Sequence, residues 1–453
     1  MTRDASAHAE AIFRAGLDRV DPLRMMRRVL TLSGDTLTCA TEKESFSLDL
    51  SAYNRILVLG AGKASARMAR GLEDLLGDRI SAGLVAVKEG HLEELSRIRL
   101  LEAAHPVPDA RSAQAAIDIL DLARSAGEGD LVFVLVSGGG SAILAAPAQE
   151  EGHALSLADK QAVTRELLAC GANIQEINCL RKHLSAIKGG RLARAIAPAR
   201  CVSLILSDVV GDDLDAIASG LTVPDPTTWA DAWAVVERYG LAGRIPAEAE
   251  ALLQAGLAGR VPDTPKAADP AFAATRTVLI GTNYQALLAA QAKAVELGYA
   301  PLLLTSRLTG EAREMAGLFL SLAKDIAAHG LPVARPACVI AGGETTVTLR
   351  GTGRGGRNQE MALAYLAGLA ASPAGAEDAV FLSASTDGSD GPTDAAGAFA
   401  SLDILRQARF KGVNPFAALA DNDSYTFFDT LGRLLRTGPT NTNVCDVHVL
   451  IVP

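Results

Sequence analysis

The stretch 131-LVFVLVSGGGSA-142 decides the fold, because it joins an unbroken apolar run to a glycine turn. An apolar run without alternation is typical of a parallel strand that is buried on both faces. Similar runs occur nearby, IRLL at 98–101 and CVSLIL at 201–206. Helical periodicity lies between them, for example in AQAAIDILDLARSA at 113–126. The alternation of strands and helices predicts a parallel sheet with helices on both faces.

The alternation stops at 257–275, a stretch rich in Pro and Ala that has no clear period. It resumes at 277–281 and continues to VHVLIV at 447–452. An antiparallel pair is expected around Gly342–Gly343, between ACVIAGG at 337–343 and TTVTLRG at 345–351. A chain of 453 residues is too long for one ordinary core. We therefore expect two α/β domains. They are a larger parallel-sheet α/β/α sandwich over 1–256, a linker over 257–275 and a smaller mixed-sheet domain over 276–453.

The composition excludes several classes of function. A net charge of −9 and the lack of a basic run argue against a nucleic-acid partner. No window approaches the ~18 uninterrupted apolar residues of a membrane span, and the amino terminus lacks the apolar core of a signal peptide. The six cysteines include no CxxC pair, which suits reduced thiols. We expect a cytoplasmic globular protein, and the sequence leaves a homo-oligomer open.

Polar loops follow nearly every predicted strand. In parallel α/β sheets, ligands bind outside the carboxyl ends of the strands, so these loops should converge on one crevice or on two facing ones. They are GAGKAS at 60–65, HPVPD at 105–109, SGGGSA at 137–142, SDVVGDD at 207–213, GTN at 281–283, GGRNQE at 355–360 and STDGSDG at 385–391.

The GAGKAS loop matches neither of the two motifs that it suggests. The third glycine of a dinucleotide fingerprint is replaced by Ser65, and Lys88 stands where an acidic ribose ligand is needed. A phosphate-binding P-loop requires a glycine where this chain has Leu57. Lys63 therefore offers an ammonium group to phosphate or carboxylate oxygens. The alternative is a surface lysine beside a tight turn.

The SGGGSA loop could bind a phosphate, shape a nucleophile's turn, hold a dinucleotide or simply end a strand. Neither Ser137 nor Ser141 has the G-x-S-x-G surroundings of a nucleophile elbow. Three successive glycines, Gly138, Gly139 and Gly140, leave backbone amides uncovered where a helix begins, which favours an anion. A plain tight turn is the alternative.

Charged side chains in the remaining loops suggest a metal ion and an anion. Magnesium prefers a few carboxylates together with phosphates and water. Asp208 and Asp387 lie just beyond their strands and are the preferred ligands, followed by Asp390. The alternative is a structural role, because Asp also caps helices and closes glycine turns. Arg354 and Arg357 precede an apolar helix, where the helix dipole disfavours cations, so they indicate an anionic ligand. An arginine that extends into solvent is the alternative.

Together these motifs resemble the class II glycerate 2-kinases, from about Arg55 to the last strand. The resemblance is carried by GAGKAS, AHPVPDARS, VLVSGGGSAIL, NCLRKHLSAIKGGRLA, LILSDVVGDDLDAIASGLTVPDPTT, IAGGETTVTLRGTGRGGRNQEMALA, STDGSDGPTDAAGA and TGPTNTNVCDVHVLI. It implies a Rossmann-like amino-terminal domain, a smaller MOFRL-type carboxyl-terminal domain and an active site in the cleft between them. The implied reaction is the ATP- and Mg²⁺-dependent phosphorylation of D-glycerate on its 2-hydroxyl. Some members are named hydroxypyruvate reductase, so a nicotinamide-dependent oxidoreductase is one alternative, and a non-catalytic metabolite-binding module is another.

The resemblance also implies roles for two residues, and the other assignments below are hypotheses from the loops themselves. The family's proposed catalytic lysine falls on Lys63 and its proposed catalytic arginine on Arg357, and Asp387 is the expected acceptor of the hydroxyl proton. The expected substrate ligands are Lys63, Arg357 and Asn283. The expected phosphate and nucleotide ligands are Ser137, Gly138, Gly139, Gly140, Ser141 and Lys188. The expected Mg²⁺ ligands are Asp208, Asp387 and Asp390.

Overall fold

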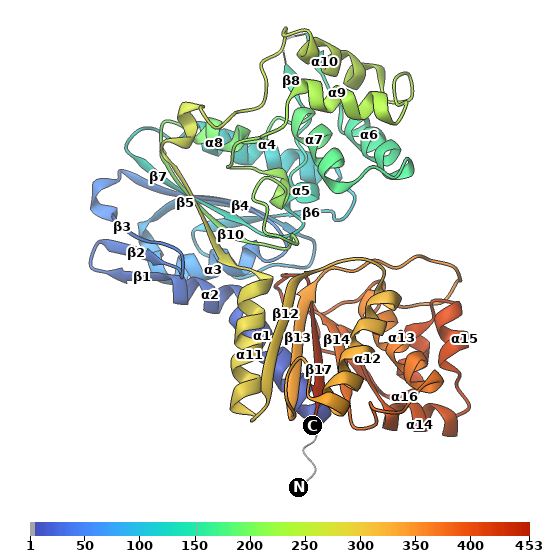
Figure 1. Cartoon of the computed structure of the whole chain (residues 1–453). Helices are drawn as coiled ribbons and strands as arrows, with labels where there is room; N and C mark the ends of the chain where they lie inside the picture. The colour runs from blue at the N-terminus through green and yellow to red at the C-terminus, as the bar shows by residue number, and fades with distance from the viewer. Residues whose placement is uncertain (1–4, 151) are drawn as a thin grey trace. The chain divides into compact units, whose positions relative to one another are not determined.

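The computed structural model describes residues 5–150 and 152–453, which form two compact units (Figure 1). The first unit holds residues 22–280, and the second holds 5–21 together with 281–453. The segment 257–275, expected as a linker, lies inside the first unit. Helix α1 (Ala5–Arg19), expected in the amino-terminal domain, packs in the second unit, beside α11 (Asn283–Glu296). Within the described residues, no helix is long and apolar enough to cross a membrane.

The first unit is built on a six-stranded sheet with the order β11-β10-β7-β4-β5-β6. Five of its strands, from β10 to β6, pair in parallel, which confirms the predicted parallel sheet. Strand β7 carries the stretch LVFVLV and is buried at every position. The strands are β4 (Arg55–Ala61), β5 (Ile80–Lys88), β6 (Ile98–Ala103), β7 (Asp130–Val136), β10 (Arg200–Leu206) and β11 (Thr275–Gly281).

Helices cover this sheet and extend into a helical subdomain with its own core. The helical period predicted at 113–126 falls on α4 (Ala110–Arg124), which contributes Ile119 and Leu120 to the core of the sheet. Helices α6, α7, α9 and α10 pack around a separate core that includes Trp229. The helices are α2 (Pro22–Val29), α3 (Ser65–Leu76), α4, α5 (Gly140–Ile143), α6 (Leu157–Ala169), α7 (Ile174–His183), α8 (Arg191–Ile196), α9 (Trp229–Arg238) and α10 (Ala247–Leu257). Short strands complete the unit: β1 (Leu30–Ser33), β2 (Thr36–Ala40), β3 (Ser45–Asp49), β8 (Gln149–Glu150) and β9 (His153–Ala154).

The second unit is built on a mixed sheet with the order β12-β13-β17-β14-β15-β16. The antiparallel partner expected for β13 was residues 345–351, and this prediction was wrong. Strand β13 pairs in parallel with β12 on one edge and antiparallel with β17 on the other, so neither edge is open to a hairpin. The strands are β12 (Ala300–Leu308), β13 (Ala337–Gly343), β14 (Val380–Ser385), β15 (Gly397–Ser401), β16 (Leu434–Leu435) and β17 (Asp446–Val452).

Alternate residues of these central strands face opposite layers of helices, as the two-residue period of a strand requires. Ile340 and Val449 pack with α1 and α11. Val339 and Leu450 pack on the other side with the helices that follow β12 and β13. The helices on that side are α12 (Ala312–His329), α13 (Arg357–Ala371), α14 (Leu402–Phe410), α15 (Pro415–Ala420) and α16 (Ser424–Leu431).

Candidate active site

Two glycine loops meet at the point where the sheet of the first unit changes direction. Strands β4 and β7 are neighbours, and the chain proceeds outward from them to opposite edges of the sheet. Ligands of open α/β sheets bind at such a switch point, beyond the carboxyl ends of the strands. The two loops are bonded to each other here, since the backbone N–H of Lys63 donates to the Gly138 carbonyl at 2.8 Å.

The side chain of Ser137, which was expected to bind phosphate, joins the two loops to each other. Its side chain is fully buried, and its Oγ accepts a hydrogen bond from the Ala64 amide at 3.0 Å. Ser65 Oγ lies 3.0 Å from the same atom. A Cβ built on Gly62 would lie 2.1 Å from Ser137 Oγ, so that position needs glycine. The hydroxyl of Ser137 is therefore bonded to the first loop, and a contact between this residue and phosphate stays a prediction.

The three glycines are not equivalent. Gly139 has a φ of +81°, a left-handed conformation that favours glycine. The amide of Gly140 donates to the Ser137 carbonyl at 3.3 Å and so belongs to the turn itself. Because the Gly140 amide already donates within the turn, the amides of Gly138 and Gly139 are the better candidates to bind an anion.

Side chains from three other loops surround Gly138 and Gly139. A Cβ on Gly139 would lie 3.1 Å from His105 Nε2 and 3.3 Å from Lys63 Cγ. A Cβ on Gly138 would lie 2.1 Å from Asp208 Oδ2. These side chains follow β4, β6 and β10, so the predicted convergence of loops is confirmed within this unit. His105 was not predicted as a site residue, although its loop follows a strand in the same way.

The side chains of Lys188 and Ser141 make hydrogen bonds within the protein. The side chain of Lys188 is buried, and its Nζ donates to the carbonyls of Ser141 at 2.6 Å and Leu144 at 2.8 Å. Ser141 Oγ lies 2.8 Å from Ser219 Oγ. Lys188 was expected to bind phosphate directly, but both carbonyl contacts turn its ammonium group toward the protein backbone.

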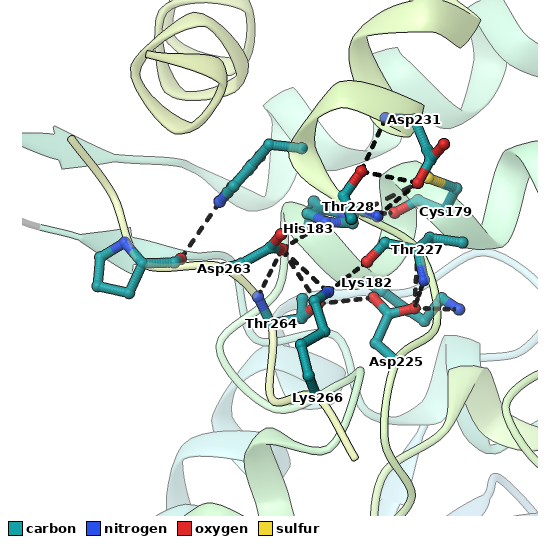
Figure 2. A network of polar contacts seen from close by, with 12 residues as sticks. Cys179, Lys182, His183, Asp225, Thr227, Thr228, Asp231, Asp263, Thr264 and Lys266 are labelled. Atoms are coloured by element: carbon teal, nitrogen blue, oxygen red, sulfur yellow. Dashed lines mark hydrogen bonds and ion pairs between the residues drawn. The ribbon is translucent and has the colours of Figure 1, made fainter. Parts of the chain in front are cut away.

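Figure 2 shows a network of polar contacts around Lys182 and His183 of α7. Lys182 Nζ lies 3.0 Å from Asp215 Oδ2 and 2.7 Å from Asp225 Oδ1, and the Asp225 side chain is fully buried. Desolvation raises the pKa of Asp225, but hydrogen bonds, the strongest from Lys182, outweigh it and leave the pKa below its usual value. The network includes His183, whose Nε2 lies 3.1 Å from Asp263 Oδ1. The loop that carries Asp208 is thus tied to α7.

In the second unit, Arg357 begins α13 and is held by two carboxylates. Its Nε and Nη2 contact Asp446 Oδ2 and Oδ1 at 2.5 and 2.9 Å, and its Nη1 contacts Glu344 Oε1 at 2.7 Å. Asp446 is fully buried, whereas the Arg357 side chain keeps 28% of its area exposed. Desolvation lowers the pKa of Arg357, but Asp446 and then Glu344 outweigh it and raise the pKa above its usual value. Neither carboxylate was predicted from the sequence.

Asp390, expected as a magnesium ligand, caps α13. Its Oδ1 accepts from the Asn358 amide at 3.1 Å, and its Oδ2 accepts from the Gln359 amide at 2.8 Å. Burial raises its pKa to about 6 against these hydrogen bonds. Both oxygens bind the first turn of the helix that carries Arg357, and the assignment of Asp390 to magnesium stays a prediction.

Asn283 was expected to bind substrate, and its amide is also used inside the protein. Its Nδ2 donates to the carbonyls of Val444 at 2.7 Å and Asp446 at 2.9 Å. The side chain therefore fixes the backbone next to the carboxylate that holds Arg357. Asp387 is half-buried, and its Oδ1 accepts from Ser385 Oγ at 3.0 Å and the Ser389 amide at 2.9 Å.

Asp208 is the carboxylate that lies against the glycine loop, where a divalent cation would bind. In the part of the chain that the structure describes, no group of three or more His, Cys, Asp or Glu side chains could hold a metal ion. Asp208 nevertheless fits a magnesium ion that is shared with phosphate. Its carboxylate lies against Gly138, and a carboxylate beside bound phosphate is the kind of ligand set that Mg²⁺ prefers.

Comparisons with known proteins find relatives over most of the chain. Residues 8–254 match the model of a domain of unknown function, DUF4147, and residues 337–446 match the MOFRL family. A Pyrococcus horikoshii protein named glycerate 2-kinase is 40% identical over 434 residues, which cover 95% of this chain and 94% of that one. An Agrobacterium vitis protein, provisionally named hydroxypyruvate reductase, is 46% identical over 400 residues, with 88% and 87% covered. The crystal structure of a glycerate kinase from Thermotoga maritima matches with a TM-score of 0.85 and 36% identity, over 99% of each chain.

Proposed function

The chain belongs to the glycerate 2-kinase family that joins a DUF4147 region to a MOFRL region, and we propose that it phosphorylates D-glycerate on the 2-hydroxyl with ATP. The observation that carries this proposal is the arrangement of Lys63 and Asp208 around a glycine loop at the switch point of the sheet. Phosphoryl transfer requires positioning and neutralisation of charge, and these groups are suited to both.

On the nucleotide side, the amides of Gly138 and Gly139 and the ammonium group of Lys63 bind phosphate oxygens. His105 lies against Gly139, and its ring N–H can donate a hydrogen bond to phosphate. Asp208 would hold Mg²⁺, which would neutralise charge on the phosphoryl oxygens when bound. These groups together would fix the γ-phosphoryl group in a single orientation.

On the acceptor side, Arg357 binds an anionic group, either the glycerate carboxylate or the transferring phosphoryl group. A guanidinium has five N–H donors, and the contacts to Asp446 and Glu344 use three of them. The two that remain lie on Nη1 and Nη2. Asp387 accepts the proton of the 2-hydroxyl as that oxygen attacks the γ-phosphorus and the bond to the ADP oxygen breaks. Free thiols at all six cysteines support a reducing compartment such as the cytoplasm.

The alternative, a hydroxypyruvate reductase, draws support from the name of the Agrobacterium vitis relative and from the strand order, which dinucleotide-binding sheets also use. Two residues oppose it. Ser65, at the third glycine position of the fingerprint, is fully buried and donates to the Leu135 carbonyl. Lys88 ends β5 where an acidic ribose ligand is needed.

One experiment separates the candidate functions. Purified protein is incubated with D-glycerate, ATP and Mg²⁺, and the phosphoglycerate isomer is identified by phosphorus NMR. Formation of 2-phosphoglycerate is expected. The 3-isomer, or hydroxypyruvate-dependent oxidation of NADH or NADPH without a need for ATP, would reject the proposal. Binding of glycerate or nucleotide without any product would identify a binding module.

A further inference from the structure

Two buried lysines support the segment that directly follows the glycine loop. Lys188 Nζ donates to the carbonyls of Ser141 and Leu144, as described above. Lys160, on α6, is also buried, and its Nζ donates to the carbonyls of Ala146 at 3.2 Å and Leu184 at 3.0 Å. Residues 141–146 thus accept hydrogen bonds from two buried lysines.

The charged groups that face these lysines are all cations. Lys160 and Arg181 face Lys188, while Arg191 and Arg181 face Lys160. Among the described residues, no carboxylate contacts either amino group. On α7, Lys182 pairs with both Asp215 and Asp225, and its contacts around Asp225 are drawn in Figure 2. Burial of positive charge without a counterion is costly, and desolvation accordingly lowers the pKa of Lys160 to about 7 and that of Lys188 well below its usual value.

We propose that Lys188, with Lys160 behind it, is a positioning residue that prepares the Ser137–Ser141 loop to bind the phosphates of a nucleotide. Its hydrogen bonds hold the Ser141 and Leu144 carbonyls inward, so that the loop presents amides and not carbonyl oxygens to the anion. Its amino group also places a positive charge beneath the loop when an anion arrives. The inference rests on the proposed function only in taking this loop as the phosphate site.

A lysine that prepares the loop for an anion should change its protonation when the anion binds, whereas a purely structural lysine should not. A bound polyanion stabilises the charged form of a nearby amine and raises its pKa. At a pH between the pKa of the lysine in the free protein and its higher pKa in the complex, the amine is neutral before the nucleotide binds and charged afterwards. At such a pH, nucleotide binding is therefore accompanied by proton uptake. A lysine that only supports the backbone would leave the proton count unchanged.

The first test uses the unaltered protein. ADP is titrated calorimetrically at about pH 8.5, where its phosphates are fully ionised, in two buffers of different ionisation enthalpy. The difference in binding heat between the buffers gives the number of protons exchanged. Uptake of a measurable fraction of a proton is expected, and no uptake would overturn the proposal. Since D-glycerate is absent, this result does not depend on which alcohol the enzyme phosphorylates.

The second test compares Lys188→Met and Lys160→Met with Lys324→Met, a control lysine whose Nζ contacts Ser372 in the second unit. Lys188→Met is expected to weaken ADP binding about tenfold or more and to abolish proton uptake. The KM for D-glycerate should stay within about twofold of the original value. Unchanged ADP affinity in a variant with a native circular dichroism spectrum would overturn the proposal, and so would an equal rise of both KM values. If Lys188→Met does not fold, the proton count of the unaltered protein decides. Failure of the proposed function would appear separately, as the absence of 2-phosphoglycerate.

Discussion

Replacement of Asp446 by Asn tests whether the orientation of Arg357 controls catalysis. Asp446 is fully buried and contacts Arg357 through both carboxylate oxygens. Asparagine has nearly the same shape but carries no charge and offers one acceptor oxygen. Its amide nitrogen would face one of the N–H groups of the guanidinium, so one of the two hydrogen bonds must break.

The size of the effect follows from the burial of the pair. Removal of one partner from a buried ion pair costs about 3–5 kcal/mol. Arg357 keeps 28% of its side chain exposed and retains Glu344, so we expect a loss of about 2–3 kcal/mol in the free energy of unfolding. For a unit of this size, such a loss lowers Tm by about 4–12 °C. A misplaced guanidinium should also lower kcat by about a hundredfold.

The matched control is Glu344→Gln, because Glu344 contacts the same guanidinium while 45% of its side chain is exposed. An exposed ion pair contributes less than about 1 kcal/mol, so this variant should change Tm by only a few degrees. Tm is measured by calorimetry, and kcat is measured from 2-phosphoglycerate formation below the lower transition. Asp446→Asn with unaltered Tm and kcat would refute the reasoning, since the buried contact would then serve neither stability nor orientation.

Further predictions concern the other site residues. Lys63→Ala and Arg357→Ala should each lower kcat by about two orders of magnitude or more with the fold intact. Arg357→Lys should lose nearly as much activity, because an ammonium group cannot make the two-point contact with Asp446. Near-normal turnover in a variant of Lys63 or Arg357 would remove the substituted residue from the mechanism. Asp208→Asn should raise the Mg²⁺ concentration needed for half-maximal activity about tenfold or more, and an unchanged Mg²⁺ dependence would place the ion elsewhere. Because burial raises the pKa of Asp390 from 3.8 to about 6, the folded state binds this proton more tightly than the unfolded state, so Asp390 should lose stabilising effect as the pH rises from about 4 to about 6. Thermal unfolding of Asp390→Asn across this range should therefore lack part of the pH dependence of the unaltered protein, and parallel curves would contradict the assignment.

The sequence predicted the strands, the two α/β units and the loops of the site, because these depend on local patterns of apolar residues and glycine. It could not separate residues that face a ligand from residues that support the loop. The difference depends on partners distant in the chain. Ser137 binds an amide 73 residues away, Lys188 a carbonyl 47 residues away and Asn283 a carbonyl 163 residues away. Polar residues in a glycine loop look alike in sequence, whichever side of the backbone they occupy.

The missed carboxylate at Asp446 did leave a signal. It opens the strand DVHVLIV, in which every position is buried, and an acidic residue in such a strand requires a partner. The sequence does not name that partner, because Arg357 lies 89 residues earlier. Helix α1 shows the same limit at the level of domains. Its apolar residues Ile12 and Phe13 indicate a buried face, but only the structure identifies the second unit as what they cover.

The surroundings of the cations give the two units different electrostatic roles. Arg357 is bonded to two carboxylates, Asp446 and Glu344, so this cluster carries no excess of positive charge with which to neutralise a triphosphate. The two carboxylates instead fix the orientation of the guanidinium, which keeps two N–H donors for a ligand. Lys188 and Lys160 have no acidic partner among the described residues, and they lie beneath the glycine loop. Under the proposed function, the positive charge that nucleotide phosphates require would therefore come from the first unit, where these amines take up protons as the anion binds. Substitutions around Arg357 should consequently act on kcat, whereas substitutions beneath the loop should act on nucleotide affinity.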